Sequence, residues 1–294
     1  MPETLPRVGI PDLDAPDTPG LSDRVREAGG EPVPLEVFGP CPGGGVALAR
    51  EWFADRAAVA IPAARLDALL AVTGRPEEVS ALLLASLRTD LPLVFVSRPS
   101  DPFSAAVAAL GLAPLSGEAV ETAVEVARSG GPEFGKLIES FSFANALRAS
   151  LSLRGGPETV LHLMALSREA VLPGFSRMLR VLAPEIPAVT DPGSRWFEEH
   201  GVPGLFAYLG DDLNDTRSIT GGFKEGLPPA PEAPGEDAGP SPVFVKGRAS
   251  STEGLCLPRG TVEDGKVSGQ CRTFTSEDAA VRAVARGDVE AGHL

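Results

Sequence analysis

A strand–helix–strand unit within Leu66–Ser97 constrains the fold of this chain more than any other feature of its sequence. Leu66–Val72 is an apolar segment of strand length, and Leu91–Ser97 is apolar almost throughout, as strands buried in a parallel sheet are. Between them, Pro76–Glu78 suits the first turn of a helix, because proline tolerates that position and carboxylates favour the positive end of the helix dipole. Two strands joined by a helix at this spacing predict a right-handed crossover in an α/β layer.

The residues before this unit continue the alternation. We expect strands at Leu5–Ile10 and Val33–Phe38, and helices at Leu21–Ala28 and Arg50–Ala64, with Pro62 ending or kinking the second helix. After Pro102 the pattern becomes helical. Further helices are predicted at Phe103–Gly111, Ser116–Ser129, Phe141–Leu153, Glu158–Val171 and Arg195–Leu209.

The C-terminal part differs in composition. Residues 226–242 are rich in Pro, Gly and acidic residues and indicate a linker between a domain at 1–225 and a smaller segment at 243–294. In that smaller segment the pattern predicts short strands and one helix. They are expected at Val243–Lys246, Gly254–Leu257, Lys266–Ser268, Gln270–Phe274 and Ser276–Arg286.

Charge restricts the partners that we expect. Asp and Glu number 40 against 26 Lys and Arg, a formal net charge of -14. Such a surface repels phosphate backbones and anionic membranes, so neither nucleic acid nor a membrane is an expected partner. The apolar runs are far shorter than the roughly 20 residues of a membrane-spanning helix. The first residues lack the basic and apolar regions of a secretion signal, so a cytoplasmic location is expected.

Few residues are candidates for chemistry. Cys41 lies in the loop Gly39–Gly45, whose amides could cradle a phosphate, although a plain turn and a bystander thiol are the favoured alternatives. His162 has apolar helical neighbours, which favours a core histidine over a catalytic one. Asp211–Asp215 could hold a cation but lacks the pattern of a calcium-binding loop, so a turn is preferred. With three cysteines and no C-x-x-C pair, the chain cannot supply a four-thiolate site alone.

Three segments together resemble the dihydroxy-acid dehydratase and phosphogluconate dehydratase family. Phe141–Ala170, with Val160–Leu163 (VLHL) and the ending Arg168–Ala170 (REA), is similar to a helical block of that family. Arg50–Ser97 is similar to a second family segment, almost without gaps. Ser251–Gly292 resembles the opening of the family's β-barrel domain, so a truncated, barrel-like C-terminal segment is expected.

The resemblance implies a chemistry whose ligands this chain lacks. Members of the family dehydrate dihydroxy or sugar acids to 2-keto acids with an iron–sulfur cluster and a magnesium ion. Where the family has Cys-Asp-Lys, this chain has Arg75-Pro76-Glu77, and of these three only Glu77 could bind a metal. The other two cluster cysteines have no counterpart. The chain is also expected to end, at Leu294, before the part of the barrel that carries the family's last metal ligand and catalytic serine.

Three functions therefore stay open. The first is a shortened, non-catalytic homologue, without cluster or metal, that acts as a homo-oligomer such as a dimer or with a full-length dehydratase paralogue. The second is a hydro-lyase with a rebuilt site, for which Glu77, Cys41, Glu158 and His162 are candidates. The third is a protein that binds a small hydroxy acid through Arg75 and Arg98, which follow strands at the edge where α/β sheets bind ligands.

Overall fold

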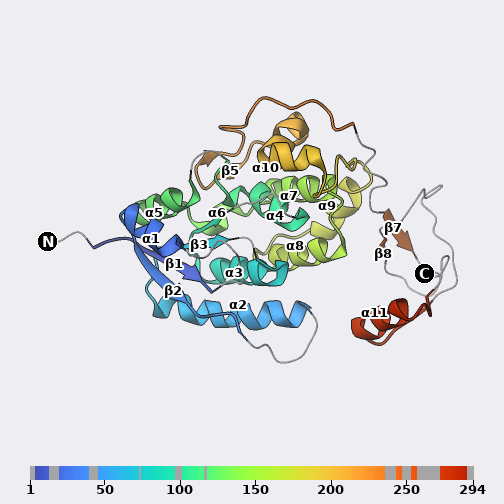
Figure 1. Ribbon diagram of the computed structural model, residues 1–294, viewed down its shortest axis with the longest axis horizontal. Coiled ribbons are helices and arrows are strands. Elements are labelled where there is room, and N and C mark those ends of the chain that lie inside the picture. The colour runs from blue at the N-terminus through green and yellow to red at the C-terminus, as the bar shows by residue number, and fades with distance from the viewer. Residues whose placement is uncertain are drawn as a thin grey trace.

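In the computed structural model a parallel sheet organises the N-terminal part of the chain (Figure 1). The structure describes residues 4–12, 20–39, 46–72, 74–96, 101–115, 118–235, 243–246, 253–256 and 272–289. The sheet contains β1 (Arg7–Pro11), β2 (Glu31–Leu35), β3 (Ala68–Val72) and β4 (Leu93–Val96), in the order β2-β1-β3-β4. All three pairings are parallel, which confirms the predicted α/β class.

The predicted strand–helix–strand unit is confirmed as β3, α3 (Pro76–Thr89) and β4. Every residue of β3 is buried, and so is the middle of α3, because this crossover lies in the centre of the molecule. In register, Leu69 of β3 pairs with Leu93 of β4. Continuous apolar sequence is what a strand covered on both faces requires.

Helices cover the sheet on two sides. α2 (Val46–Ala63) packs against α3, whereas α1 (Leu21–Glu27) and α5 (Ala119–Ser129) contact the strands from the other side. The helices between residues 102 and 212, α5 excepted, form a second group, most of which lies above α3 in Figure 1. This group comprises α4 (Pro102–Val107), the π-helical turn η1 (Ala108–Leu112), α6 (Phe134–Leu137), α7 (Ser140–Ser152), α8 (Pro157–Glu169), α9 (Phe175–Leu182), α10 (Arg195–Leu209) and the 3-10 turn η2 (Gly210–Asp212).

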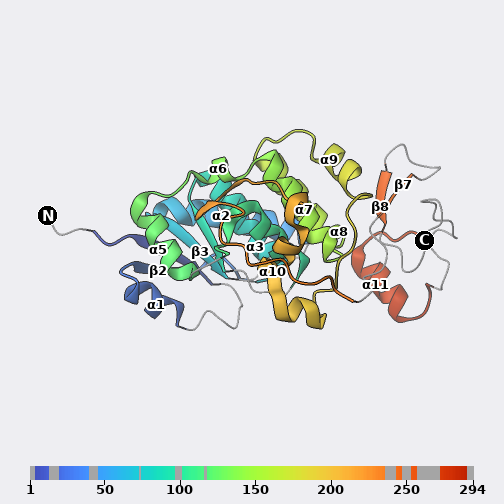
Figure 2. The same ribbon diagram turned by 90° about the horizontal axis from the view of Figure 1, so that it is seen from above.

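The C-terminal elements are small. β5 (Arg217–Ser218) and β6 (Gly221–Gly222) form a short antiparallel pair. β7 (Val243–Lys246) and β8 (Glu253–Cys256) form another, and α11 (Glu277–Ala285) follows. In both views these last three elements lie at one end of the molecule (Figures 1 and 2).

One C-terminal strand prediction is partly wrong. Within the predicted strand Gln270–Phe274, residues 272–274 are irregular and exposed, because they lead directly into Ser276, which caps α11 by accepting a hydrogen bond from the Ala279 N–H. The predicted strand Lys266–Ser268 lies outside the described residues. The division at 225 and 242 and the barrel-like character of the last segment stay predictions.

One of the two edges of the sheet is formed by β2, whose sequence is EPVPL, and the other by β4. Glu31 donates its N–H to the Pro6 carbonyl at 2.8 Å, on the side of β1. Residues alternate in direction along a strand, so Pro32 and Pro34 lie where N–H groups would otherwise point away from β1. The side of β2 that faces away from β1 therefore lacks two backbone N–H donors.

Candidate functional site

The carboxyl edge of the parallel sheet is the place where this topology positions a site. From β1 the chain crosses to β2 on one side, and from β3 it crosses to β4 on the other. The carboxyl ends of β1 and β3 are therefore the topological switch point, where open α/β sheets bind ligands. Asp12 follows β1 there and Arg75 follows β3.

Two aspartates at this edge accept hydrogen bonds from backbone N–H groups. Asp12 Oδ1 accepts hydrogen bonds from the N–H groups of Val37 and Phe38 at 2.8 and 2.9 Å, and so ties the end of β1 to the segment after β2. Asp101, after β4, caps α4 by accepting from the N–H groups of Phe103 and Ser104 at 2.8 and 2.9 Å. These carboxylates shape the edge rather than present free oxygens.

Arg75 lies at the switch point with its charge already compensated. Its guanidinium pairs with the buried Glu78 carboxylate, and its Nη1 lies 3.4 Å from Oε1 of Glu77. The Arg75 side chain is 61% exposed, whereas Glu77 is 14% and Glu78 2% exposed. One cation thus faces solvent above two largely buried carboxylates, at the first turn of α3.

His162 of α8 lies away from the switch point, beside Phe103 of α4 and near the charge of Arg50 on α2. The residue is fully buried, and neither ring nitrogen has a hydrogen-bond partner within the described structure. Its ring centroid lies 5.2 Å from that of Phe103, and its Nε2 lies 3.9 Å from Oε1 of Glu158. Burial, reinforced by the nearby Arg50 charge, lowers the pKa of His162 to about 4, so the imidazole is neutral at pH 7.

The predicted site residues therefore fall into separate groups. Glu77 and Arg75 are brought together, and so are His162 and Glu158. Among the described side chains, no hydrogen bond, ion pair or ring contact joins Glu77 to His162. Cys41 and Arg98 lie outside the described residues.

The side chains that the sequence suggested as metal ligands do not lie together either. In the part of the chain that the structure describes, no three His, Cys, Asp or Glu side chains cluster in a way that could hold a metal ion. In the acidic segment Asp211–Asp215, Asp215 accepts the backbone N–H of Lys224 at 3.4 Å, and Lys224 Nζ lies 4.0 Å from Asp211. This pattern is that of the turn favoured by its sequence.

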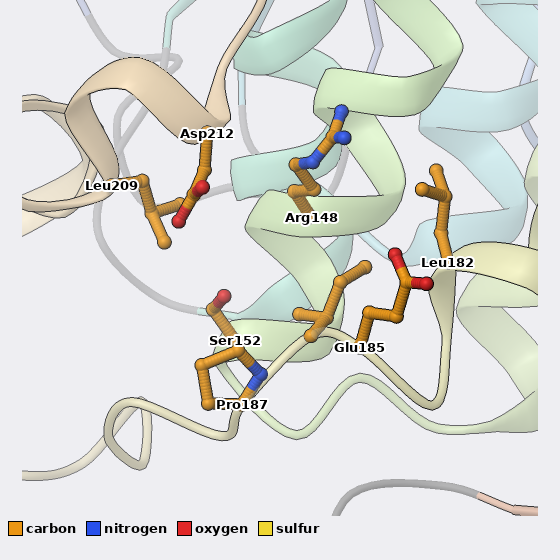
Figure 3. Close-up of a pocket in the computed structure, with 8 residues that line it drawn as sticks. Arg148, Ser152, Leu182, Glu185, Pro187, Leu209 and Asp212 are labelled. Carbon is orange, nitrogen blue, oxygen red and sulfur yellow. The ribbon is translucent and has the colours of Figure 1, made fainter.

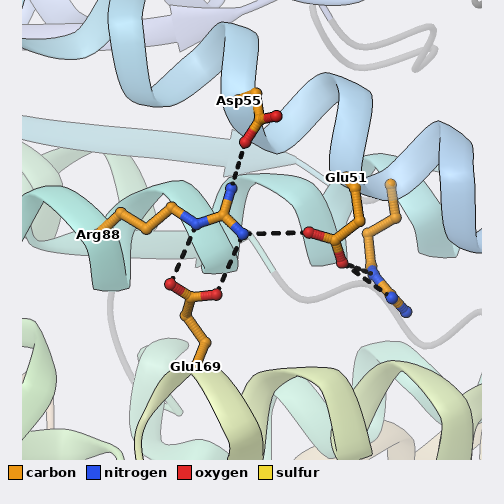
Figure 4. A network of polar contacts seen from close by, with 5 residues as sticks. Glu51, Asp55, Arg88 and Glu169 are labelled. Atoms are coloured by element: carbon orange, nitrogen blue, oxygen red, sulfur yellow. Dashed lines mark hydrogen bonds and ion pairs between the residues drawn. The ribbon is translucent and has the colours of Figure 1, made fainter.

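A charge network that the sequence prediction missed joins α2, α3 and α8 (Figure 4). Arg88 of α3 donates to both carboxylate oxygens of Glu169 at 3.1 Å, to Asp55 at 2.9 Å and to Glu51 at 3.1 Å. Glu51 also accepts from Arg50 at 2.9 Å. These hydrogen bonds, that to Glu169 foremost, raise the pKa of Arg88 above its usual value. The sequence feature that could have indicated this network is the four-residue spacing of Glu51 and Asp55, which puts both carboxylates on one face of a helix.

No helix in the described residues is long and apolar enough to cross a membrane.

The chain is similar to dihydroxy-acid dehydratases over about half of its length. It is 32% identical to that of Pelobacter propionicus over 171 residues, 52% of this chain and 31% of the relative. The corresponding enzymes of Syntrophotalea carbinolica and Geobacter metallireducens are 32% and 29% identical over 175 and 177 residues, and 31% and 32% of each is covered. No family model matches the chain. The matched segment thus spans about a third of these curated relatives, and dihydroxy-acid dehydratases are the proteins that this chain resembles.

Proposed function

We propose that this chain is a divergent dehydratase homologue that does not dehydrate an acid by itself and acts by associating with a second copy or with a full-length dehydratase. The observation that carries the proposal is the Arg75 cluster at the carboxyl end of β3. In the family that the sequence resembles, this turn supplies a cluster thiolate and magnesium ligands.

The donors at this turn do not fit either group. Iron–sulfur clusters require thiolates and magnesium requires hard oxygen ligands. Here the first position is a guanidinium, the second a proline, and the third, Glu77, is paired with that guanidinium at 3.4 Å. A cation placed beside Arg75 would be repelled, and Glu77 would have to exchange its present partner. We therefore derive no reaction step through a cluster or a metal ion.

An apolar groove between α7 and α9 supports association. The groove has a volume of about 390 Å³ and is lined by Phe141, Ala144, Met178, Val181 and Leu182. Phe141 is 61% and Val181 54% exposed, although both are large and apolar. Covering such side chains removes apolar surface from water at about 25 cal/mol per Å², and this favours contact with a second chain.

The test is the oligomeric state of the full chain by sedimentation velocity over a range of concentrations. We expect reversible association that the double change Phe141→Glu and Val181→Glu abolishes. Val59→Glu is the matched control, because Val59 of α2 is 73% exposed and lies outside the groove. A wild-type chain that stays monomeric and does not bind a purified full-length dehydratase would refute the proposal.

A small-acid binding protein is the second candidate, favoured by the exposure of Arg75 at the switch point. A carboxylate ligand would have to share the guanidinium with Glu77 and Glu78. We would compare the melting temperature of wild type and Arg75→Gln across short hydroxy acids. A shift that depends on Arg75 supports this function, and a melting temperature indifferent to every acid excludes it.

An active hydro-lyase with a rebuilt site is the third candidate. Its residues would be Glu77, Cys41, Glu158 and His162, and the contact of His162 with Glu158 at 3.9 Å is the observation in its favour. Metal and acid-labile sulfide analysis of anaerobically purified protein, with turnover of sugar acids, decides this case. Stoichiometric iron and sulfide would overturn our first proposal.

A further inference from the structure

The helix α10 carries a cluster of three aromatic rings that are only partly buried. The ring centroid of Trp196 lies 5.1 Å from that of His200 and 5.8 Å from that of Tyr208, and both pairs meet edge to face. Trp196 and Tyr208 lie near opposite ends of α10, but Gly201, with φ +59° and ψ -163°, interrupts the helix between them. This kink brings Tyr208 back to Trp196. We call Trp196, His200 and Tyr208 the aromatic face of α10.

The other sides of α10 are anchored in the body of the molecule. Phe206 is fully buried. Leu209 is buried as well and lines a small cavity together with Ser152 of α7 (Figure 3). These contacts fix the second half of the helix, and with it the place of Tyr208 in the aromatic face.

A proline-rich segment of the same chain lies on this aromatic face. Residues 227–234 (LPPAPEAP) form neither helix nor strand and run past α10 (Figure 1). Nε1 of Trp196 donates a hydrogen bond to the Glu232 carbonyl at 2.8 Å. Pro231 lies beside Gly204 of α10, where an added Cβ would be 3.9 Å from the Pro231 Cγ. The segment is therefore bound to α10 through both a hydrogen bond and a proline ring.

The burial of this segment fits a polyproline II helix. Pro231 and Pro234 are half-buried, whereas the two residues between them and all of Pro228–Ala230 are exposed. A polyproline II helix has three residues per turn, so prolines three positions apart lie on one side of it. It also has no internal hydrogen bonds, and no backbone hydrogen bond joins residues 228–234 to one another in this described segment.

These features are those by which proteins recognise proline-rich peptides. Aromatic side chains line such sites, and the peptide carries a P-x-x-P motif in an extended conformation that costs little entropy to bind. An indole adds an N–H donor at the edge of an apolar ring. The chain's own segment is held only lightly here, by the bond from Trp196 and by two half-buried prolines, so it can leave without opening the core.

We infer that the aromatic face of α10 binds a proline-rich segment of another protein, with a P-x-x-P motif, and that residues 231–234 occupy this site until such a partner displaces them. The partner's two prolines take the places of Pro231 and Pro234, and one of its carbonyls accepts from Trp196. A second copy is the poorer occupant, because an exchange of identical segments gains no contact. The inference does not depend on the proposed function, since the α7–α9 groove contains none of these residues.

The test measures binding of a fluorescein-labelled peptide, LPPAPEAPG (residues 227–235), to the full chain by fluorescence anisotropy. The tethered segment competes at an effective concentration of about 1 mM, so wild type should bind the peptide weakly. Pro231→Ala combined with Pro234→Ala frees the site, and we expect the peptide to bind this opened variant about tenfold or more tighter. Pro228→Ala combined with Pro229→Ala is the matched control, because these exposed prolines should not matter.

Two tryptophan variants locate the site. In the opened variant, Trp196→Phe keeps an aromatic ring but removes the N–H donor, and should weaken peptide binding by about two- to tenfold. Trp52→Phe, the same change at the chain's other tryptophan, which is exposed on α2, should have no effect.

Three outcomes would overturn the inference. The first is no saturable binding of the peptide to the opened variant. The second is equal binding of a peptide that has alanine at both prolines of its P-x-x-P motif. The third is a wild-type dimer in sedimentation velocity that Pro231→Ala with Pro234→Ala converts to a monomer, because it would assign the site to a second copy.

Discussion

His162 makes the stability of the chain depend on pH, because the pKa of its ring differs between the folded and the unfolded chain. Its pKa is about 4 in the folded chain against an ordinary 6.5, because the ring is buried beside Arg50. The unfolded chain therefore binds a proton more readily than the folded chain between these values. Above pH 6.5 the ring is neutral in both states, and the full stability of the folded chain is present. As the pH falls towards 4, the unfolded chain gains a proton at His162 that the folded chain does not, so the free energy of unfolding decreases.

We expect the free energy of unfolding to fall by up to about 3 kcal/mol from His162 alone between pH 6.5 and 4. The measurement is urea denaturation at several pH values for wild type and His162→Gln. The variant, which cannot titrate at this position, should lose less stability over the same window. Parallel pH profiles for the two proteins would show that burial does not depress this pKa.

Arg88 is the other residue whose removal has a clear consequence. It is 23% exposed and neutralises carboxylates from two other helices. Arg88→Met leaves Asp55 and Glu169 without their cation and Glu51 with Arg50 alone, so we expect a loss of about 1–3 kcal/mol in urea denaturation, less than for a fully buried pair because these carboxylates are partly exposed. Arg128→Met, in an exposed pair with Glu125 on one helix, should cost less than about 1 kcal/mol. Equal losses would mean that the network contributes no more than a surface pair.

At this scale the sequence predicts individual residues only where a local rule applies. Arg75 and Glu77 were predicted at a strand end, and the structure puts both at the first turn of α3. Arg88 was not singled out, because its partners Glu51, Asp55 and Glu169 lie on two other helices and reach it only through tertiary packing. Helical spacing shows that two side chains share a face but not what lies opposite.

Among the elements, η1 depends on a glycine. Gly111 has φ +84°, and a Cβ there would lie 2.6 Å from the Arg217 carbonyl oxygen of β5. The Gly111 carbonyl also accepts the Ile219 N–H at 2.7 Å, so the turn and the β5–β6 pair cannot separate without losing this bond.

Gly111→Ala is therefore expected to destabilise the chain by about 2–4 kcal/mol, from backbone strain and from overpacking together. Gly130→Ala is the matched control, because Gly130 has φ +78° with nothing within 4 Å of the added Cβ. It should cost only the strain, about 1–2 kcal/mol. Thermal or urea unfolding measures both, and a loss at Gly111 no larger than at Gly130 would exclude the proposed contact with β5.

Long periodic helices and short apolar strands such as β3, β4 and β7 were predictable, whereas α9, β5 and β6 were not. α7 and α8 carry apolar residues at helical spacing over 13 residues each, and their predicted bounds agree with the structure to within one or two residues. α9 was missed because it has eight residues and two arginines interrupt its apolar pattern. β5 and β6, with two residues each, form through pairing that no local sequence signal encodes.

For the whole molecule, the net charge of -14 opposes any association between identical chains. Salt screens this repulsion over about 8–10 Å at physiological ionic strength. The proposed self-association should therefore tighten as sodium chloride is raised from 50 to 500 mM (about 14 to 4 Å of screening length). Sedimentation velocity measures the trend, and weaker association at high salt would indicate that ion pairs, rather than the α7–α9 groove, hold the copies together.

The prolines of β2 bear on which architectures such an assembly can have. Many proteins join two sheets into one by hydrogen-bonding their edge strands, which needs an unbroken row of donors and acceptors. At Pro32 and Pro34 the outward row of β2 has acceptors but no donors, so a continuous sheet across two copies is disfavoured at this edge. Pairing of two copies along β2 is thus disfavoured, and for the same reason edge-to-edge aggregation through this strand is disfavoured as well.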